Sequence, residues 1–128
     1  MVRSVPAAFF ALAATLFSGT VIASPIPEKR AAEHYGKGTW YDAGLGACGY
    51  TDSNNDLVVA LPVKAYGNGE NCNKYLQIKN TASGATARGR VRDKCPGCEG
   101  ESIDMSPALF KELGSLDQGV LQIEWKYT

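Results

Sequence analysis

Two aspartates that lie eleven residues apart, Asp93 and Asp104, bracket a closely spaced pair of cysteines, Cys95 and Cys98. The short Cys-Pro-Gly-Cys segment between them limits how far apart the two carboxylates can move. Paired carboxylates are how proteins act on glycosidic bonds, where one protonates the leaving oxygen and the other activates water or attacks the sugar. Such a pair can also hold a sugar without cutting it. The segment 93–104 therefore indicates a carbohydrate site, either catalytic or only binding.

Asp104 is the first candidate for an acid. Its apolar neighbours Ile103 and Met105 can raise the pKa of its carboxyl, as a general acid requires. A structural alternative is that Asp104 accepts hydrogen bonds from the start of the helix that follows. For Asp93 the alternative is a surface ion pair, worth about 0–1 kcal/mol, with a nearby Arg90, Arg92 or Lys94.

Short apolar and β-branched runs that end at turn residues predict strands over 38–41, 57–61, 75–79, 86–91 and 120–125. One helix is expected, with Ser106 as its cap, Pro107 in its first turn and Gly114 at its end. Five or six short strands with one short helix favour a small closed barrel over a layered α/β fold.

The chain begins with features of export. Arg3 precedes an apolar stretch over 6–21, and the break at Ser24 predicts a secretory signal peptide over 1–23. Residues 24–30 are expected to be a propeptide that ends in the dibasic pair Lys29-Arg30. A secreted, extracellular domain of 98 residues over 31–128 would remain.

The composition of this domain excludes several partners. Residues 31–128 hold ten Lys and Arg against twelve Asp and Glu, a formal charge of −2. A domain with this charge lacks the basic surface that binds nucleic acid, and its sequence has no polybasic cluster that would bind an anionic membrane. His34, the only histidine, precedes the predicted strands and is expected to be solvated. No cofactor and no metal are expected.

Six motifs in fixed order carry a family resemblance. They are Gly38–Asp42, Gly46–Gly49, Asp56–Leu61, Val91–Cys98, Ile103–Ser106 and Gly119–Trp125. Together they resemble RlpA-like double-psi β-barrel proteins, in particular the small secreted fungal, loosenin-type and expansin-like single-domain members. The resemblance covers residues 36–128. It implies an all-β, six-stranded double-psi β-barrel with one or two short helices and a shallow groove over one face.

The resemblance also implies a binding site. In expansins the groove holds a threonine and two aspartates, which match Thr39, Asp93 and Asp104 here. Trp40 and Tyr41 are neighbours in one strand, so their side chains point to opposite faces. One is expected to fill the core and the other to offer a flat ring to a sugar. Weaker candidates for that stacking role are Tyr35, Tyr50, Tyr66 and Trp125.

Asp42 is a weaker candidate for a catalytic base. Family 45 endoglucanases, which resemble this barrel, take their base from an aspartate shortly after the first strand's threonine. Asp42 lies in about that place, one residue closer to Thr39. An inverting pair needs its carboxyls about 6.5–9.5 Å apart. The alternative is a turn aspartate that binds its own backbone ahead of Gly44.

The four cysteines are expected to form disulfides, because the count is even and the chain carries an export signal. Spacing alone leaves three connectivities open. By analogy with expansins, Cys48 pairs with Cys72 and Cys95 with Cys98. A redox motif at Cys95–Cys98 would need a helix start within a βαβ unit, which the pattern lacks. A four-cysteine zinc site does not suit an oxidising compartment.

These features together predict a secreted monomer that binds cell-wall polysaccharide, such as cellulose, chitin or a related glucan. It would loosen the wall without net hydrolysis. One alternative is an enzyme, either a glycoside hydrolase or a lytic transglycosylase, with Asp104 as its general acid. The other is a cysteine-protease inhibitor, or a secreted effector that acts on a host protein, built on the same barrel.

Overall fold

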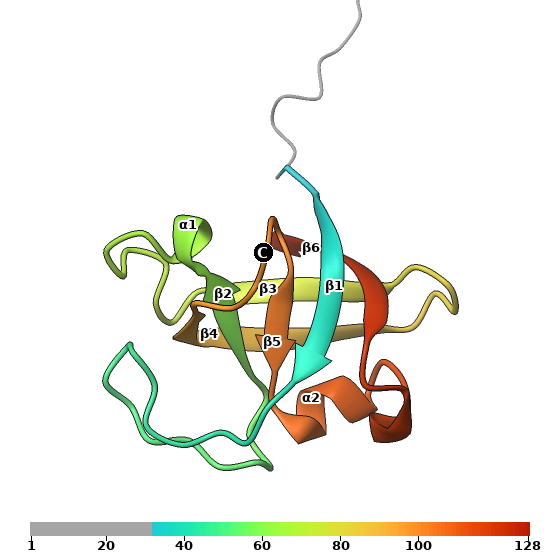
Figure 1. Cartoon of the computed structure of the whole chain (residues 1–128), viewed down its shortest axis with the longest axis horizontal. Coiled ribbons are helices and arrows are strands. Elements are labelled where there is room, and N and C mark those ends of the chain that lie inside the picture. The colour runs from blue at the N-terminus through green and yellow to red at the C-terminus, as the bar shows by residue number, and fades with distance from the viewer. Residues whose placement is uncertain (1–31) are drawn as a thin grey trace, which may run out of the picture. The chain divides into compact units, whose positions relative to one another are not determined.

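The computed structural model describes residues 32–128, which form a closed barrel of six strands (Figure 1). The signal peptide and propeptide expected over 1–30 lie outside the described residues. The strands are β1 (His34–Trp40), β2 (Val58–Pro62), β3 (Tyr75–Asn80), β4 (Thr86–Cys95), β5 (Ile103–Met105) and β6 (Leu121–Tyr127). Two short helices, α1 (Val63–Tyr66) and α2 (Pro107–Lys111), and a 3-10 turn, η3 (Leu116–Gln118), connect them. The expected six-stranded barrel with short helices is confirmed.

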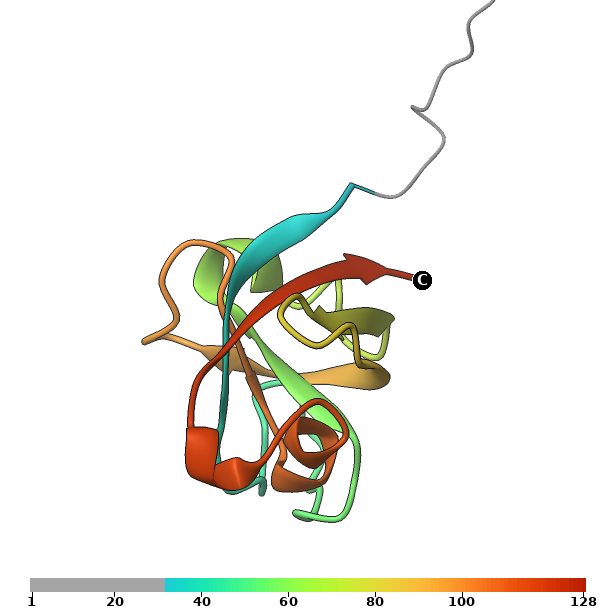
Figure 2. The ribbon, with the colours of Figure 1, turned by 90° about the vertical axis from the view of Figure 1, so that its right-hand side faces the viewer.

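The barrel is mixed, and its strand order is β1-β5-β2-β4-β3-β6. β1 pairs with β5, and β2 with β4, in parallel, while the remaining pairs are antiparallel. In Figure 1, β1, β5 and β2 run side by side across the front, with β3 and β4 crossing behind them. Figure 2 shows β6 following β1 along its length, which closes the barrel. The three-residue β5 thus brings the segment after the cysteine pair next to the first strand.

Alternate residues of the strands fill the interior. Leu76 and Ile78 of β3 and Ile123 and Trp125 of β6 are all buried, while their neighbours along each strand face outward. This alternation is expected of strands with one face on a core.

Among the described residues, no helix is both long and apolar enough to cross a membrane.

Helix α2 covers one end of the barrel and begins where the sequence predicts. The Ser106 side chain accepts a hydrogen bond from the Leu109 backbone N–H at 3.4 Å, and proline occupies the first turn. Leu109 and Phe110 are fully buried against the core. The cap therefore belongs to Ser106, and Asp104 does not serve as one.

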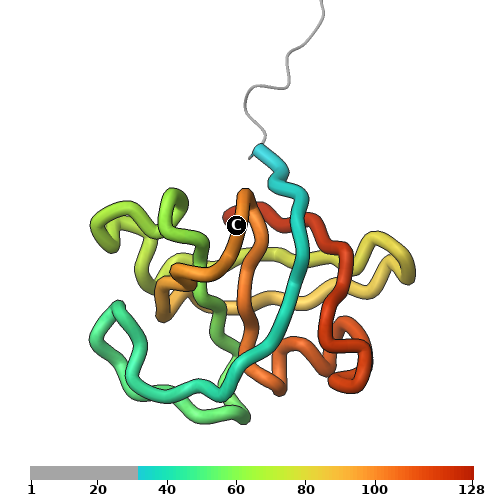
Figure 3. Tube along the Cα trace, in the orientation of Figure 1, coloured from blue at the N-terminus to red at the C-terminus, as the bar shows by residue number. Residues whose placement is uncertain are grey.

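Two disulfides fix the longer connections. Cys48 is bonded to Cys72, which ties the 41–57 connection to the segment before β3, and Cys95 is bonded to Cys98. These are the pairs that the family resemblance implies. Figure 3 shows the 41–57 connection as a wide excursion from the barrel between β1 and β2.

Candidate functional site

The two aspartates lie in one row that crosses four neighbouring strands. Thr39 on β1 is the register partner of Asp104 on β5, and Asp104 is the partner of Ala60 on β2. Ala60 in turn is the partner of Asp93 on β4. We call these residues the Thr39–Asp93 row. Since neighbouring strands lie about 4.8 Å apart, the two aspartate Cα atoms are separated by two strand spacings, roughly 10 Å.

A β-bulge places Asp93 in this row. Val59 pairs with Val91, but the next residue, Ala60, pairs with Asp93, so Arg92 is an extra residue on β4. Strict alternation would put Val91 and Asp93 on the same face, and Val91 is fully buried in the core. The extra residue lets Asp93 share the outward face with Ala60.

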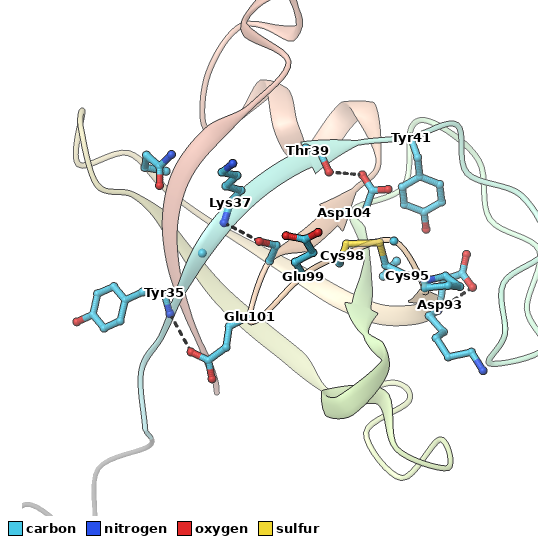
Figure 4. Close-up of a pocket in the computed structure, with 18 residues that line it drawn as sticks. Tyr35, Lys37, Thr39, Tyr41, Asp93, Cys95, Cys98, Glu99, Glu101 and Asp104 are labelled. Atoms are coloured by element: carbon cyan, nitrogen blue, oxygen red, sulfur yellow. Dashed lines mark hydrogen bonds between the residues drawn. A yellow bond between two sulfur atoms is a disulfide. The ribbon is translucent and has the colours of Figure 1, made fainter.

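The row lies in an open groove of about 980 Å³ (Figure 4). One side of the groove is formed by outward side chains of β1 and the residue after it, Tyr35, Lys37, Thr39 and Tyr41. The opposite side is the segment 93–102, which carries the Cys95–Cys98 disulfide. Ala60 lies between the two aspartates, and its single methyl group leaves space above this part of the groove floor.

Asp104 is half-buried and held by Thr39. The Thr39 hydroxyl donates a hydrogen bond to Asp104 Oδ1 at 2.9 Å. Burial raises the pKa of the Asp104 carboxyl, and the charge of Asp93 adds to this rise. The hydrogen bonds from Thr39 and from the Met105 backbone act in the opposite direction. The carboxyl can therefore accept from a sugar hydroxyl when ionised, or donate a proton when neutral.

Asp93 is anchored by backbone groups. Its Oδ1 accepts hydrogen bonds from the N–H groups of Ala47 at 2.7 Å and Lys94 at 2.8 Å. The ion pair of the neighbouring Arg92 is formed with Asp52, at 3.2 Å, instead of with Asp93. Within residues 32–128, Asp93 Oδ2 accepts no hydrogen bond and is available to a ligand.

Tyr41 supplies a hydroxyl beside the two carboxylates (Figure 4). Burial raises the pKa of this phenol strongly, and the charges of Asp93 and Asp104 raise it further. The group therefore stays protonated at any physiological pH. It can donate a hydrogen bond to a ligand oxygen that lies beside these two carboxylates.

Two of the predicted site residues, Trp40 and Asp42, do not line the groove. Trp40 remains 36% exposed, and its indole N–H donates to the Leu116 carbonyl at 3.1 Å. The expectation that Trp40 or Tyr41 fills the core is wrong, because the chain leaves the barrel at this point. Asp42 is exposed and accepts a hydrogen bond from the Asn54 side chain at 3.1 Å, within the 41–57 connection.

Of the weaker stacking candidates, only Tyr35 is at the groove, where it is 60% exposed. Trp125 and Tyr66 are buried and cannot offer a ring face. The Tyr50 ring is covered by the Arg92 guanidinium, whose central carbon lies 3.9 Å from the centre of the ring.

His34 is not solvated, and that expectation is wrong. β1 begins at His34, so its ring stacks on Trp125 with centroids 4.1 Å apart. Its Nδ1 lies 2.7 Å from the Glu101 carboxylate. The same carboxylate accepts a hydrogen bond from the Tyr35 backbone N–H at 3.2 Å. His34 and Glu101 thus hold the 99–102 segment against β1.

Sequence reasoning missed several groove residues, namely Lys37, Ala60, Glu99, Glu101, Ser102 and Gln122. Period-two alternation back from Thr39 would have indicated Lys37 and also Tyr35. The residues of the 99–102 segment have no such signal. Their position depends on a close approach at Gly36, where a Cβ atom would lie 2.8 Å from the Glu101 backbone.

Comparisons with known proteins identify relatives of this barrel. No family model matches the chain. It is 37% identical over 121 residues to the papain inhibitor of Streptomyces mobaraensis, which covers 88% of this chain and 82% of the inhibitor. An allergen Asp f 7 homolog of Arthroderma benhamiae is 44% identical over 81 residues, or 61% of this chain. The chain belongs to the expansin-like double-psi β-barrel family.

A solved structure in this family carries a sugar. An aspartate-to-asparagine mutant of Clavibacter michiganensis expansin, in complex with cellohexaose, superposes with a TM-score of 0.69 at 25% identity. The match covers 76% of the present chain and 50% of that expansin. The chain also spans only 28% of the length of the allergen homolog. The expansin-like barrel is thus shared with proteins that differ in length and in the rest of their chains.

Proposed function

We propose that this protein is a secreted, expansin-like protein that binds cell-wall polysaccharide in its groove and loosens it without net hydrolysis. The observation that carries this proposal is the Thr39–Asp93 row, which presents two carboxylates along an open groove. The complex of a related expansin with cellohexaose supports a glucan as the ligand. The two disulfides support an oxidising, extracellular location.

The groove offers both hydrogen-bond acceptors and a donor to a sugar chain. Asp93 and Asp104 accept from hydroxyl groups, and the protonated Tyr41 donates. Hydrogen bonds to a charged group contribute about 1.5–3 kcal/mol each. The exposed Tyr35 ring lies at the groove and can stack on a pyranose face. A glucan bound here exchanges hydrogen bonds to neighbouring glucans for hydrogen bonds to the protein, which separates the chains.

Binding without cleavage is favoured by the position of the carboxyls. Asp104 has the raised pKa of a candidate acid. A glycoside hydrolase also needs a second group to act on water or on the sugar. Asp42, the candidate for that role, is outside the groove lining. Asp93 accepts two backbone N–H bonds, which favours a fixed acceptor that grips the ligand.

The proposal is tested by retention on insoluble cellulose and chitin, with reducing ends measured in each supernatant. Asp104→Asn and Asp93→Asn should each weaken retention by about tenfold, because each removes a charged acceptor. Asp42→Asn is the matched control and should bind like the wild type. No reducing ends should appear. Absence of retention on every polysaccharide would remove the proposal, and sugar release that Asp104→Asn abolishes would replace it with hydrolysis.

A second candidate function is inhibition of a cysteine protease. The specific observation is the 37% identity to the Streptomyces mobaraensis papain inhibitor, of which the match covers 82%. The test is titration of papain with the wild type and with Asp104→Asn. Inhibition that survives this substitution would show that a surface other than the groove's acidic centre acts on a protease.

A further inference from the structure

A second polar surface lies on the outward face of β4. Arg88, Arg90 and Arg92 stand at alternate positions of this strand, and the residues between them are buried in the barrel. They line a recess of about 510 Å³ together with Tyr75 and part of the 41–57 connection. We call this surface the arginine recess. None of its residues lines the groove described above.

Arg92 is already neutralised. Its Nε lies 3.2 Å from the Asp52 carboxylate, and both side chains are largely buried. Its Nη1 donates to the Asn73 side chain at 2.6 Å, and its guanidinium carbon lies 3.9 Å from the centre of the Tyr50 ring. Arg92 and Asp52 therefore form a structural pair at the edge of the recess.

Arg88 and Arg90 are held in place but have no acidic partner within residues 32–128. Tyr75, on β3, is the register partner of Arg90 on β4. The centre of the Tyr75 ring lies 4.0 Å from the guanidinium carbon of Arg88 and 5.5 Å from that of Arg90. Stacking on a ring occupies the face of a guanidinium and leaves its N–H edge unused. The buried Arg90 Nε also lacks a hydrogen-bond partner among the described residues.

The recess also contains acceptors. Asp56 and Asn55 line it beside the arginines. One Asp56 oxygen, Oδ2, accepts a hydrogen bond from the Ser53 backbone N–H at 2.7 Å. Two ordered guanidiniums next to an amide and a carboxylate suit a ligand that bears both carboxylate and hydroxyl groups.

We propose that the arginine recess binds the uronate carboxylates of an acidic polysaccharide. A planar carboxylate matches the two-pronged donor edge of a guanidinium. A doubly charged phosphate fits less well, because Asp56 adds negative charge to the same recess and Asp52 already neutralises Arg92. The pyranose hydroxyls of a uronate would meet the polar groups of Asn55 and Asp56. This site extends the proposed function, but it does not depend on the groove.

The charges of the two surfaces favour different polysaccharides. The groove is lined by the acidic side chains Asp93, Glu99, Glu101 and Asp104 and by only two lysines. An acidic polysaccharide is repelled there. The recess, with three arginines against two aspartates, carries a net positive charge. A neutral glucan in the groove and a uronate chain in the recess can therefore bind at the same time.

The test is retention of the full protein on immobilised polygalacturonate at low salt. Arg88→Gln should weaken retention by about tenfold, and Arg88→Gln with Arg90→Gln by more, because each loses a charge-assisted contact. Lys79→Gln removes one charge from β3 outside the recess and is the matched control, expected to have little effect. Arg88→Lys keeps the charge but loses the planar fork, so it should fall between the wild type and Arg88→Gln.

Three results would overturn the proposal. The first is an Arg88→Gln variant that binds polygalacturonate as Lys79→Gln does. The second is equal retention, with the same dependence on Arg88, on polyglutamate. The third is release of the protein from polygalacturonate by inorganic phosphate at the same concentration at which free uronate releases it. Arg88 is exposed, so Arg88→Gln should fold. This single variant therefore tests the proposal even if the double variant does not fold.

The two sites are separated by a cross-check. Asp104→Asn should weaken cellulose retention and leave polygalacturonate retention unchanged, and Arg88→Gln should do the reverse. If cellulose is never bound but polygalacturonate is, the groove proposal fails and the recess proposal stands.

Discussion

Thr39 and Asp104 face each other on the parallel strands β1 and β5, and the threonine hydroxyl donates a 2.9 Å hydrogen bond to the aspartate. This bond opposes the effect of burial on the Asp104 carboxyl. Burial raises the pKa of the carboxyl, whereas the hydroxyl stabilises its ionised form. Thr39 is therefore a positioning residue that sets how much of Asp104 is ionised when a sugar arrives.

Thr39→Val should raise the pKa of Asp104 further. Valine has almost the shape of threonine but cannot donate, so the effect of burial is no longer opposed by this bond. Carbon-13 NMR titration of the Asp104 carboxyl measures the change. Thr39→Ser keeps the hydroxyl and should stay near the wild-type titration. Loss of the bond should also lower the free energy of unfolding by about 1 kcal/mol. A pKa that falls in Thr39→Val would contradict this assignment.

Asp104→Asn should make the fold more stable at neutral pH. The folded-state pKa of Asp104 is raised, so the ionised carboxyl destabilises the fold relative to the unfolded chain. This cost is absent below the unfolded-state pKa and fully present above the folded-state pKa. The stability gained by the variant should therefore grow as pH rises through that window.

Urea unfolding at acidic and neutral pH measures this difference. Asp42→Asn changes an exposed aspartate outside the groove and should alter the free energy of unfolding little. A variant that is less stable than the wild type at neutral pH would show that the Asp104 charge is favourable in the fold.

Gly46→Ala should destabilise the protein and weaken polysaccharide retention. A Cβ atom at Gly46 would lie 2.3 Å from the carbonyl oxygen of Arg92, the bulged residue of β4. The 41–57 connection would have to shift, at a cost of about 1–3 kcal/mol. Its Ala47 N–H would then lose the 2.7 Å contact that anchors Asp93.

Gly44→Ala provides the control for this change. Gly44 lies in the same connection, and a Cβ atom there meets nothing within 4 Å. Thermal unfolding and cellulose retention of both variants are the measurements. Equal behaviour of the two variants would mean that the connection does not position Asp93.

The sequence predicts the long strands and α2 because each has a clear local pattern. β3 and β6 alternate between apolar and polar residues, and Ser106-Pro107 marks a helix start. β5 has three residues and α1 has four, which is too short for a periodic signal. Those elements owe their conformation to their neighbours in the barrel.

The candidate site is predictable only in part, for physical reasons. The family resemblance points to Thr39, Asp93 and Asp104, and the structure brings all three into the groove. The bulge at Arg92, which turns Asp93 outward, has no mark in the local sequence. The sequence predicts that one of Trp40 and Tyr41 fills the core, but β1 ends at Trp40, which remains 36% exposed, and Tyr41 lines the groove.

The two disulfides should contribute differently to stability and to binding. Cys48–Cys72 joins residues 24 positions apart, and Cys95–Cys98 joins residues three apart. In the chain-entropy account, the longer loop is worth about 3.5 kcal/mol and the shorter one about 2 kcal/mol. Cys48→Ser with Cys72→Ser should therefore lose more stability in urea unfolding than Cys95→Ser with Cys98→Ser.

For cellulose retention we expect the opposite order at a temperature where both double variants are folded. The Cys95–Cys98 bridge forms part of the groove side between Asp93 and Asp104, so its loss lets that side move and lowers the order of the ligand site. The Cys48–Cys72 bridge lies outside the groove lining. If the Cys48→Ser and Cys72→Ser variant is the one that loses retention, the 41–57 connection controls the groove more than the 93–102 segment does.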